Sequence, residues 1–186
     1  MQHRRLHPTA ADSEPPDQAA ALEIAARYLA PRPRSAWEVR RRLRKAGVDD
    51  ATCDATIDEL QRFGFVDDLS FARWWLEQRD RHSPRGRRGI EAELHQHGVD
   101  RETIAALRLE DGEPRTPGSE DLPSTEEDRA AAALARHLGD RTVSHARGDL
   151  QRLAAYLVRR GFGGDIAWGA VRNAAGASDE EADSEP

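Results

Sequence analysis

Residues 35–48 read S-A-W-E-V-R-R-R-L-R-K-A-G-V, and they contain the start, the buried face and the end of one short helix. Ser35 and Glu38 have the spacing of a capping box, in which the serine oxygen accepts from a first-turn amide and the glutamate reaches back. Leu43 lies on the apolar face of this helix, and Gly47 is well placed for the left-handed position that ends many helices. This stretch therefore predicts a helix with a leucine facing inward.

The same ending, a leucine, three residues, a glycine and an apolar residue, occurs three times in the chain. The residues that carry it are Leu43, Gly47, Leu94, Gly98, Leu157 and Gly161. The glycines lie 51 and 63 residues apart, and an acidic stretch accounts for the longer interval. A period near 50 residues predicts tandem modules, in which each small unit packs on its neighbour.

Capping and turn signals separate further short helical periods. Ser83-Pro84 offers a cap followed by proline at the first helical position, and Ser124 with Glu127 forms a second candidate capping box. No segment alternates like a strand over five or more residues, so we predict an all-α fold of three tandem three-helix modules. The expected boundaries are a disordered tail at 1–18, module 1 at 19–64, module 2 at 65–109, an acidic flexible linker at 110–125, module 3 at 126–174 and a disordered acidic tail at 175–186.

The formal net charge of −6 is unevenly distributed. Residues 110–128 hold eight acids and one arginine, and residues 175–186 hold five acids and no base, so the rest of the chain is basic. Cys53 is the single cysteine, which excludes an internal disulfide and a cysteine zinc site. No apolar run reaches the roughly 18 residues of a membrane span, and the N-terminus lacks the apolar region of a signal peptide. We expect a cytoplasmic protein that does not enter membranes.

Three stretches carry a family resemblance. Residues 28–39 read Y-L-A-P-R-P-R-S-A-W-E-V, residues 64–72 read G-F-V-D-D-L-S-F-A, and residues 86–99 read G-R-R-G-I-E-A-E-L-H-Q-H-G-V. The first resembles the Y-L-x-x-R-x-x-S-x-x-E-[LV] opening of the RecX family, bacterial regulators of the RecA recombinase, with Arg32 at its arginine. The second resembles the junction G-[FY]-[LIV]-[DN]-[DE]-x-x-[FY]-A of the same family. The resemblance is strong over residues 20–108, and over 126–174 it is a similarity of the repeat.

The resemblance implies three tandem three-helix modules in an elongated, curved arrangement. It also implies a protein with no enzymatic activity and no cofactor, which lies in the groove of the RecA filament on DNA. Such a protein restrains filament growth, ATP hydrolysis and strand exchange. We expect a monomer.

Two basic clusters are the candidate partner-binding sites. The first comprises Arg32, Arg34, Arg40, Arg41, Arg42, Arg44 and Lys45, and the second comprises Arg79, Arg81, Arg85, Arg87 and Arg88. Only Glu38 opposes the seven bases of residues 32–45, which argues against mutual ion pairing within that window. A guanidinium binds carboxylate or phosphate in a bidentate manner. The hypothesis is an anionic partner, and the alternative is a solvated face in an arginine-rich chain.

Other candidate sites have simpler structural interpretations. Trp74 and Trp75 offer base-stacking platforms, but adjacent tryptophans on a helix are more often packing residues, and we expect packing for Trp37 and Trp168 as well. Asp67-Asp68 is better explained as a helix cap than as a metal site. His95 and His97 lie on different helix faces without companion ligands, so we expect no zinc there.

Two functions remain open from the sequence. One is a regulator that binds RecA, and the other is a direct DNA-binding module, since three-helix units with basic helices resemble helix-turn-helix readers. Residues 36–46 contain no Asn or Gln, which argues against reading of base sequence.

Overall fold

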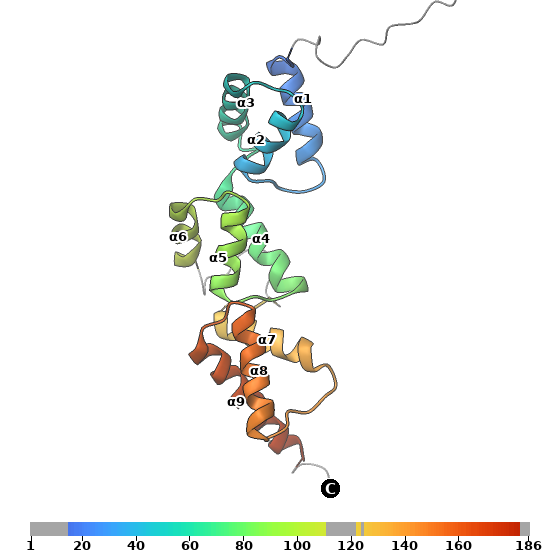
Figure 1. Cartoon of the computed structure of the whole chain (residues 1–186), viewed down its shortest axis with the longest axis vertical. Helices are drawn as coiled ribbons and strands as arrows, with labels where there is room; N and C mark the ends of the chain where they lie inside the picture. The colour runs from blue at the N-terminus through green and yellow to red at the C-terminus, as the bar shows by residue number, and fades with distance from the viewer. Residues whose placement is uncertain (1–14, 111–121, 124, 183–186) are drawn as a thin grey trace, which may run out of the picture. The chain divides into compact units, whose positions relative to one another are not determined.

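The computed structural model describes residues 15–110, 122, 123 and 125–182, with side chains to residue 176, and all regular structure in these residues is helical. The helices are α1 (Gln18–Leu29), α2 (Ala36–Lys45), α3 (Asp50–Arg62), α4 (Asp68–His82), α5 (Arg87–Gln96), α6 (Arg101–Leu109), α7 (Glu126–Leu138), α8 (Arg147–Arg159) and α9 (Gly164–Ala182). Within each successive group of three, every helix contacts the other two (Figure 1). The prediction of an all-α fold of tandem three-helix modules is confirmed.

Each module has its own core around the leucine of the repeat. Leu43, Leu94 and Leu157 are fully buried. The glycine that follows each leucine has a positive φ, namely 86° at Gly47, 75° at Gly98 and 91° at Gly161. Glycine adopts this left-handed conformation without the steric penalty that a Cβ imposes. The repeated sequence pattern therefore corresponds to one repeated helix ending in three separate cores.

Short polar side chains begin several helices. At α2 the predicted capping box is present, since Ser35 Oγ accepts from the Glu38 amide at 3.1 Å and Glu38 Oε2 accepts from the Ser35 amide at 3.3 Å. Asp49 caps α3 by accepting from the Thr52 amide at 3.0 Å. This hydrogen bond lowers the pKa of Asp49, because it favours the charged carboxylate.

Modules 2 and 3 belong to one compact unit, from Asp68 onward, whereas module 1 ends at Asp67 in a unit of its own. In the second unit the C-terminus of α8 meets the N-terminus of α5 (Figure 1). The Gly86 amide donates to the Arg160 carbonyl at 3.2 Å. A Cβ at Gly89 would lie 2.6 Å from that carbonyl oxygen, and one at Gly161 would lie 2.2 Å from the Gly89 nitrogen. We call this contact of Gly86, Gly89 and Gly161 the glycine joint.

The predicted cap at Ser83-Pro84 is wrong, because α5 begins at Arg87 with Gly86 as its N-cap. The Ser83 amide instead donates to the Arg79 carbonyl at 2.7 Å and closes α4. The guanidinium of Arg160 then donates to Ser83 Oγ and, at 3.1 Å, to the Pro84 carbonyl. A contact with module 3 therefore replaces the local cap that the sequence suggests.

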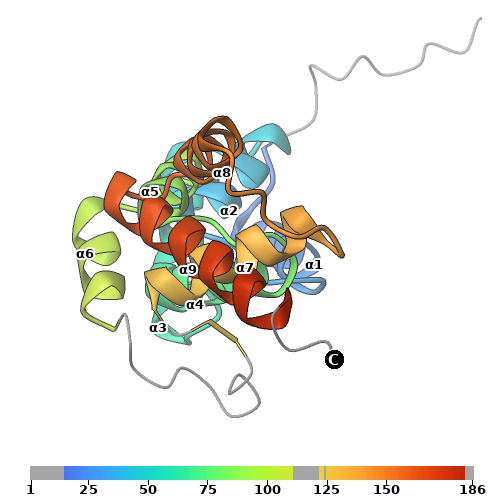
Figure 2. The same ribbon diagram turned by 90° about the horizontal axis from the view of Figure 1, so that it is seen from below.

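Two other boundaries differ from expectation. The capping box before α7 is formed by Thr125 and Asp128, one residue after the predicted pair, and Ser124 lies outside the described residues. Helix α9, which lies against α7 (Figure 2), continues to Ala182, so a disordered tail from residue 175 is wrong for 175–182. Ala175 is buried, so packing holds the helix at the residue where the predicted tail begins. Most of the predicted linker and terminal tails, residues 1–14, 111–121 and 183–186, also lie outside the described residues.

Candidate interaction surface

Arg32 and Arg34 hold the turn that enters α2. Both guanidiniums approach the buried carboxylate of Glu38, at 3.0 Å for Arg32 and 3.8 Å for Arg34. Arg34 also lies over the Tyr28 ring, with its guanidinium carbon 4.1 Å from the ring centroid. Side chains fixed this way stabilise module 1 itself, so the structure separates these two predicted residues from the exposed basic surface.

Arg40 and Arg44 pair with the next helix. Arg40 forms an ion pair with Asp54, and Arg44 Nε lies 2.7 Å from Asp50 Oδ1. Both acids lie on α3, beyond the sequence window in which only Glu38 opposes the basic residues. The expected charge imbalance of α2 is therefore smaller than the window count indicates.

One line of α2 presents its side chains to solvent. Trp37, Arg41 and Lys45 follow one another at intervals of four residues, so they form a ridge along one side of the helix. All three are exposed, and the Trp37 side chain retains 41% of its accessible surface. The packing expected for Trp37 is therefore only partial, and the same holds for Trp168, which is 38% exposed. We call Trp37, Arg41 and Lys45 the α2 ridge.

The cations of the α2 ridge remain uncompensated within the described part of the chain. Arg41 lies over the indole of Trp37, with its guanidinium carbon 5.2 Å from the ring centroid. Neither Arg41 nor Lys45 forms an ion pair with another described residue, and the same holds for the exposed Arg42 beside them. The ridge thus combines an exposed aromatic face with adjacent positive charge.

Module 2 arranges part of its basic cluster around one glutamate. Arg79 Nε and Arg85 Nε each lie 2.8 Å from a carboxylate oxygen of Glu93. The Trp75 indole nitrogen donates to Glu93 Oε2, also at 2.8 Å. Trp74 and Trp75 are half-buried and lie 6.0 Å from the Phe71 ring. Arg79 and Arg85 therefore belong to the scaffold of module 2, as do both tryptophans.

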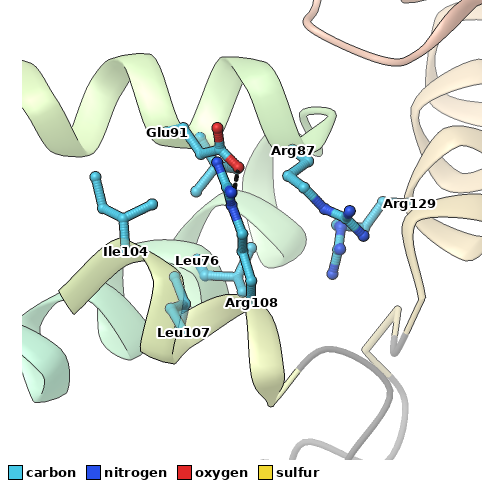
Figure 3. A pocket seen from close by; sticks show the side chains of 8 residues that line it. Leu76, Arg87, Glu91, Ile104, Leu107, Arg108 and Arg129 are labelled. Atoms are coloured by element: carbon cyan, nitrogen blue, oxygen red, sulfur yellow. Dashed lines mark hydrogen bonds and ion pairs between the residues drawn. The ribbon is translucent and has the colours of Figure 1, made fainter. Parts of the chain in front are cut away.

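Three arginines of the second cluster remain. Arg81 lies 2.6 Å from Glu77 on its own helix, and Arg87 and Arg88 begin α5. Arg87 is turned toward α7, since its amide donates to Glu126 Oε1 at 3.0 Å and its Nε lies 3.7 Å from Glu126 Oε2. Figure 3 shows Arg87 and Arg129 pointing toward one another at the edge of a small crevice of about 30 Å³. That volume holds about one water molecule. Arg88 is exposed without an ion pair to another described residue.

Other kinds of site find little support within the described residues. They contain no group of three His, Cys, Asp or Glu side chains positioned to hold a metal ion. None of their helices is both long and apolar enough to cross a membrane. The Cys53 thiol is buried, and burial raises its pKa. A thiol in this environment stays protonated at neutral pH, so it is a poor nucleophile.

Comparisons with known proteins agree on one family. The models of the first and second three-helix domains of RecX match residues 21–60 and 67–107. The regulatory protein RecX of Mycobacterium avium is 30% identical over 161 residues, which cover 86% of this chain and 87% of that protein. The regulatory protein RecX of Thermobifida fusca is 33% identical over 172 residues, covering 89% and 84%.

Solved structures share the fold. The crystal structure of RecX from Lactobacillus salivarius matches with a TM-score of 0.68 and 19% identity, over 85% of this chain and 96% of that one. A second crystal structure, of a regulatory protein RecX, matches with a TM-score of 0.62 and 18% identity, over 84% and 71%.

Proposed function

The chain belongs to the RecX family of regulatory proteins, and we propose that it binds RecA filaments on DNA and restrains their extension, ATP hydrolysis and strand exchange. In this proposal the chain acts in the cytoplasm as a monomer, by occupying a surface of the filament, and it performs no catalysis of its own. The observation that carries the proposal is the similarity to RecX proteins over more than four-fifths of the chain.

The exposed basic residues support an anionic partner. Arg41, Arg42 and Lys45 on α2 and Arg88 on α5 are exposed and have no ion pair to another described residue. Charges without internal partners raise the association rate with a surface of opposite sign and contribute to its recognition. A protein–DNA filament offers such a surface in its phosphates and in any acidic side chains beside its groove.

The test is the DNA-dependent ATPase of RecA, measured while this protein is titrated. A regulator that limits filament extension affects many RecA subunits per bound molecule. We therefore expect ATP hydrolysis to fall at ratios well below one protein per RecA. Hydrolysis that is unchanged at every ratio would refute the proposal.

A matched pair of variants then tests the surface. Replacing Arg41, Arg42 and Lys45 together with alanine removes three charges from α2 and should weaken inhibition. Replacing Arg62, Arg101 and Arg172, which are also exposed, removes the same charge elsewhere and should leave inhibition unchanged. Both variants should stay helical by circular dichroism, because alanine favours helices more than arginine or lysine does. Equal inhibition by the two variants would exclude α2 as the contact.

The second candidate function is direct, largely sequence-independent binding of DNA. The exposed indole among the α2 cations favours it, because an aromatic ring beside a basic groove is typical of proteins that bind single strands. Binding without RecA, and its dependence on salt, distinguish this function from regulation of the filament.

A further inference from the structure

We propose that the α2 ridge binds single-stranded nucleic acid, with a base stacked against Trp37 and the backbone phosphates paired with Arg41 and Lys45. The inference rests on the second candidate function, direct binding of DNA, and narrows it to a single strand held at three named residues. It rests on the exposure, spacing and charge of these three side chains.

The position of Trp37 calls for an explanation outside module 1. Its neighbour Ala36 packs against the module core, whereas 41% of Trp37 remains exposed. A large aromatic ring is normally among the side chains that gain most from burial. An indole on the outer face of a helix therefore has exposed surface for a ligand with a flat ring. Arg41 lies over this ring, so a base that stacks on that face displaces the guanidinium, which then pairs with a phosphate.

The charges beside the indole identify the class of ligand. Residues four apart on a helix are separated by about 6 Å along its axis, so Trp37, Arg41 and Lys45 present an aromatic face followed by two positive charges. The acids that compensate Arg40 and Arg44 lie on α3, at Asp54 and Asp50. The ridge itself has no such acid among the described residues. A ligand with flat rings and regularly spaced negative charges matches this arrangement, and a nucleic-acid strand has both.

Stacking on Trp37 requires a single strand, because only unpaired bases have exposed faces. In a duplex both faces of each base are covered by its neighbours, so an indole on a rigid helix has no base face to contact. An unpaired strand exposes base faces, and aromatic side chains bind them with little dependence on sequence. The absence of Asn and Gln from residues 36–46 agrees with binding that does not read base edges.

The experiment measures binding of the full chain to three labelled probes without RecA. The probes are an oligothymidylate of about 16 nucleotides, an abasic strand of the same length and a duplex of the same length, chosen from the upper end of known site sizes. Stacking of one base should favour the oligothymidylate over the abasic strand by about 5- to 150-fold. Equal affinity for these two strands would overturn the proposal.

Two variants separate stacking from charge. Trp37→Leu should abolish the preference for bases while it leaves the salt dependence unchanged, because no charge is removed. The double variant Arg41→Ala with Lys45→Ala should lower the slope of log K against log salt by about 1.4, since each phosphate contact on a single strand contributes about 0.7. Trp37→Phe retains a ring and should restore most of the preference, which guards against a general loss of folding.

Trp168 supplies the matched control, because it is a second exposed indole, at 38%, on a helix of another module. Trp168→Leu should bind all three probes like the parent chain. Identical behaviour of Trp37→Leu and Trp168→Leu would overturn the proposal. The proposal would also be overturned if the parent chain bound none of the probes while Trp37→Leu lost its inhibition of RecA, because the ridge would then contact protein. The binding assay contains no RecA, so its result can be interpreted even if the proposed regulation of RecA is refuted.

Discussion

The glycine joint allows a sharp test of how modules 2 and 3 are held together. An alanine at position 89 places its methyl carbon 2.6 Å from the Arg160 carbonyl oxygen, whereas such a contact needs about 3.3 Å. The end of α8 must therefore move by about 0.7 Å. The hydrogen bond from the Gly86 amide to the same carbonyl is already 3.2 Å long, so that movement takes it beyond hydrogen-bonding distance.

The expected magnitude follows from the bonds that change. Loss of the backbone hydrogen bond costs about 1 kcal/mol, and weakening of the Arg160 contacts with Ser83 and Pro84 costs about 1–3 kcal/mol more, because one partner is charged. Glycine to alanine in a helix returns about 1 kcal/mol. Gly89→Ala should therefore destabilise the second unit by about 1–3 kcal/mol.

Amide hydrogen exchange is the suitable assay, because a chain of several modules need not unfold in one step. Protection at the start of α5 and the end of α8 should fall in Gly89→Ala by about 5- to 150-fold. Gly148→Ala is the control, since this glycine lies in α8 and an added Cβ would meet no atom within 4 Å, and it should stabilise the helix by up to about 1 kcal/mol. If Gly89→Ala matched this control in protection and stability, the tight joint would be refuted.

Three further outcomes test other parts of the molecule. Leu43→Ala empties a fully buried position at a cost of about 2–5 kcal/mol, so circular dichroism should show loss of helix from module 1. The hydrogen bond from Thr52 lowers the pKa of Asp49. The stability that this bond contributes is fully present above the unfolded pKa of about 3.9 and is lost as the pH falls through the lower folded value. Acid unfolding of module 1 should accordingly be less steep in Asp49→Asn. Deleting residues 177–186 removes five acids and should strengthen oligothymidylate binding at low salt but not near 1 M, where the Debye length is about 3 Å.

The helical repeat is predictable from sequence because its signals are local. A capping box, a leucine and a glycine lie within 13 residues at Ser35, Glu38, Leu43 and Gly47. The conformation of each depends on neighbours in the same helix, so no knowledge of the tertiary structure is needed. The later copies around Leu94 and Leu157 follow by analogy.

The fate of individual arginines is not predictable in this way, because their partners come from other elements. Arg79 and Arg85 share Glu93 across an intervening turn, and Arg40 pairs with Asp54 on the next helix. A charge count over a short window includes none of these acids. The exposure of Trp37 is likewise decided by which face of α2 the other helices cover.

The start of α5 shows how a neighbouring module overrides a local signal. In module 1 a serine side chain caps the helix, but the equivalent N-cap in module 2 is Gly86, which has no side chain to do so. Its amide bonds to the Arg160 carbonyl instead. A side chain at this position would collide with the backbone of Gly161 at 2.4 Å. Module 3 therefore supplies part of the cap of module 2, which gives a physical reason for the two forming one compact unit.

Some basic residues of this chain are held by a glutamate within their own module, whereas others are exposed at its surface. Glu38 and Glu93 each hold two arginines that precede or begin a repeated element, and half-buried pairs of this kind are costly to break because they leave a charge without its partner. Substituting those arginines would destabilise the module and change its surface charge at the same time. Arg41 and Lys45 are exposed and outside these pairs, so their substitution changes the surface charge while the module keeps its scaffold. A partner whose affinity changes when Arg41 and Lys45 alone are substituted must therefore contact α2 directly.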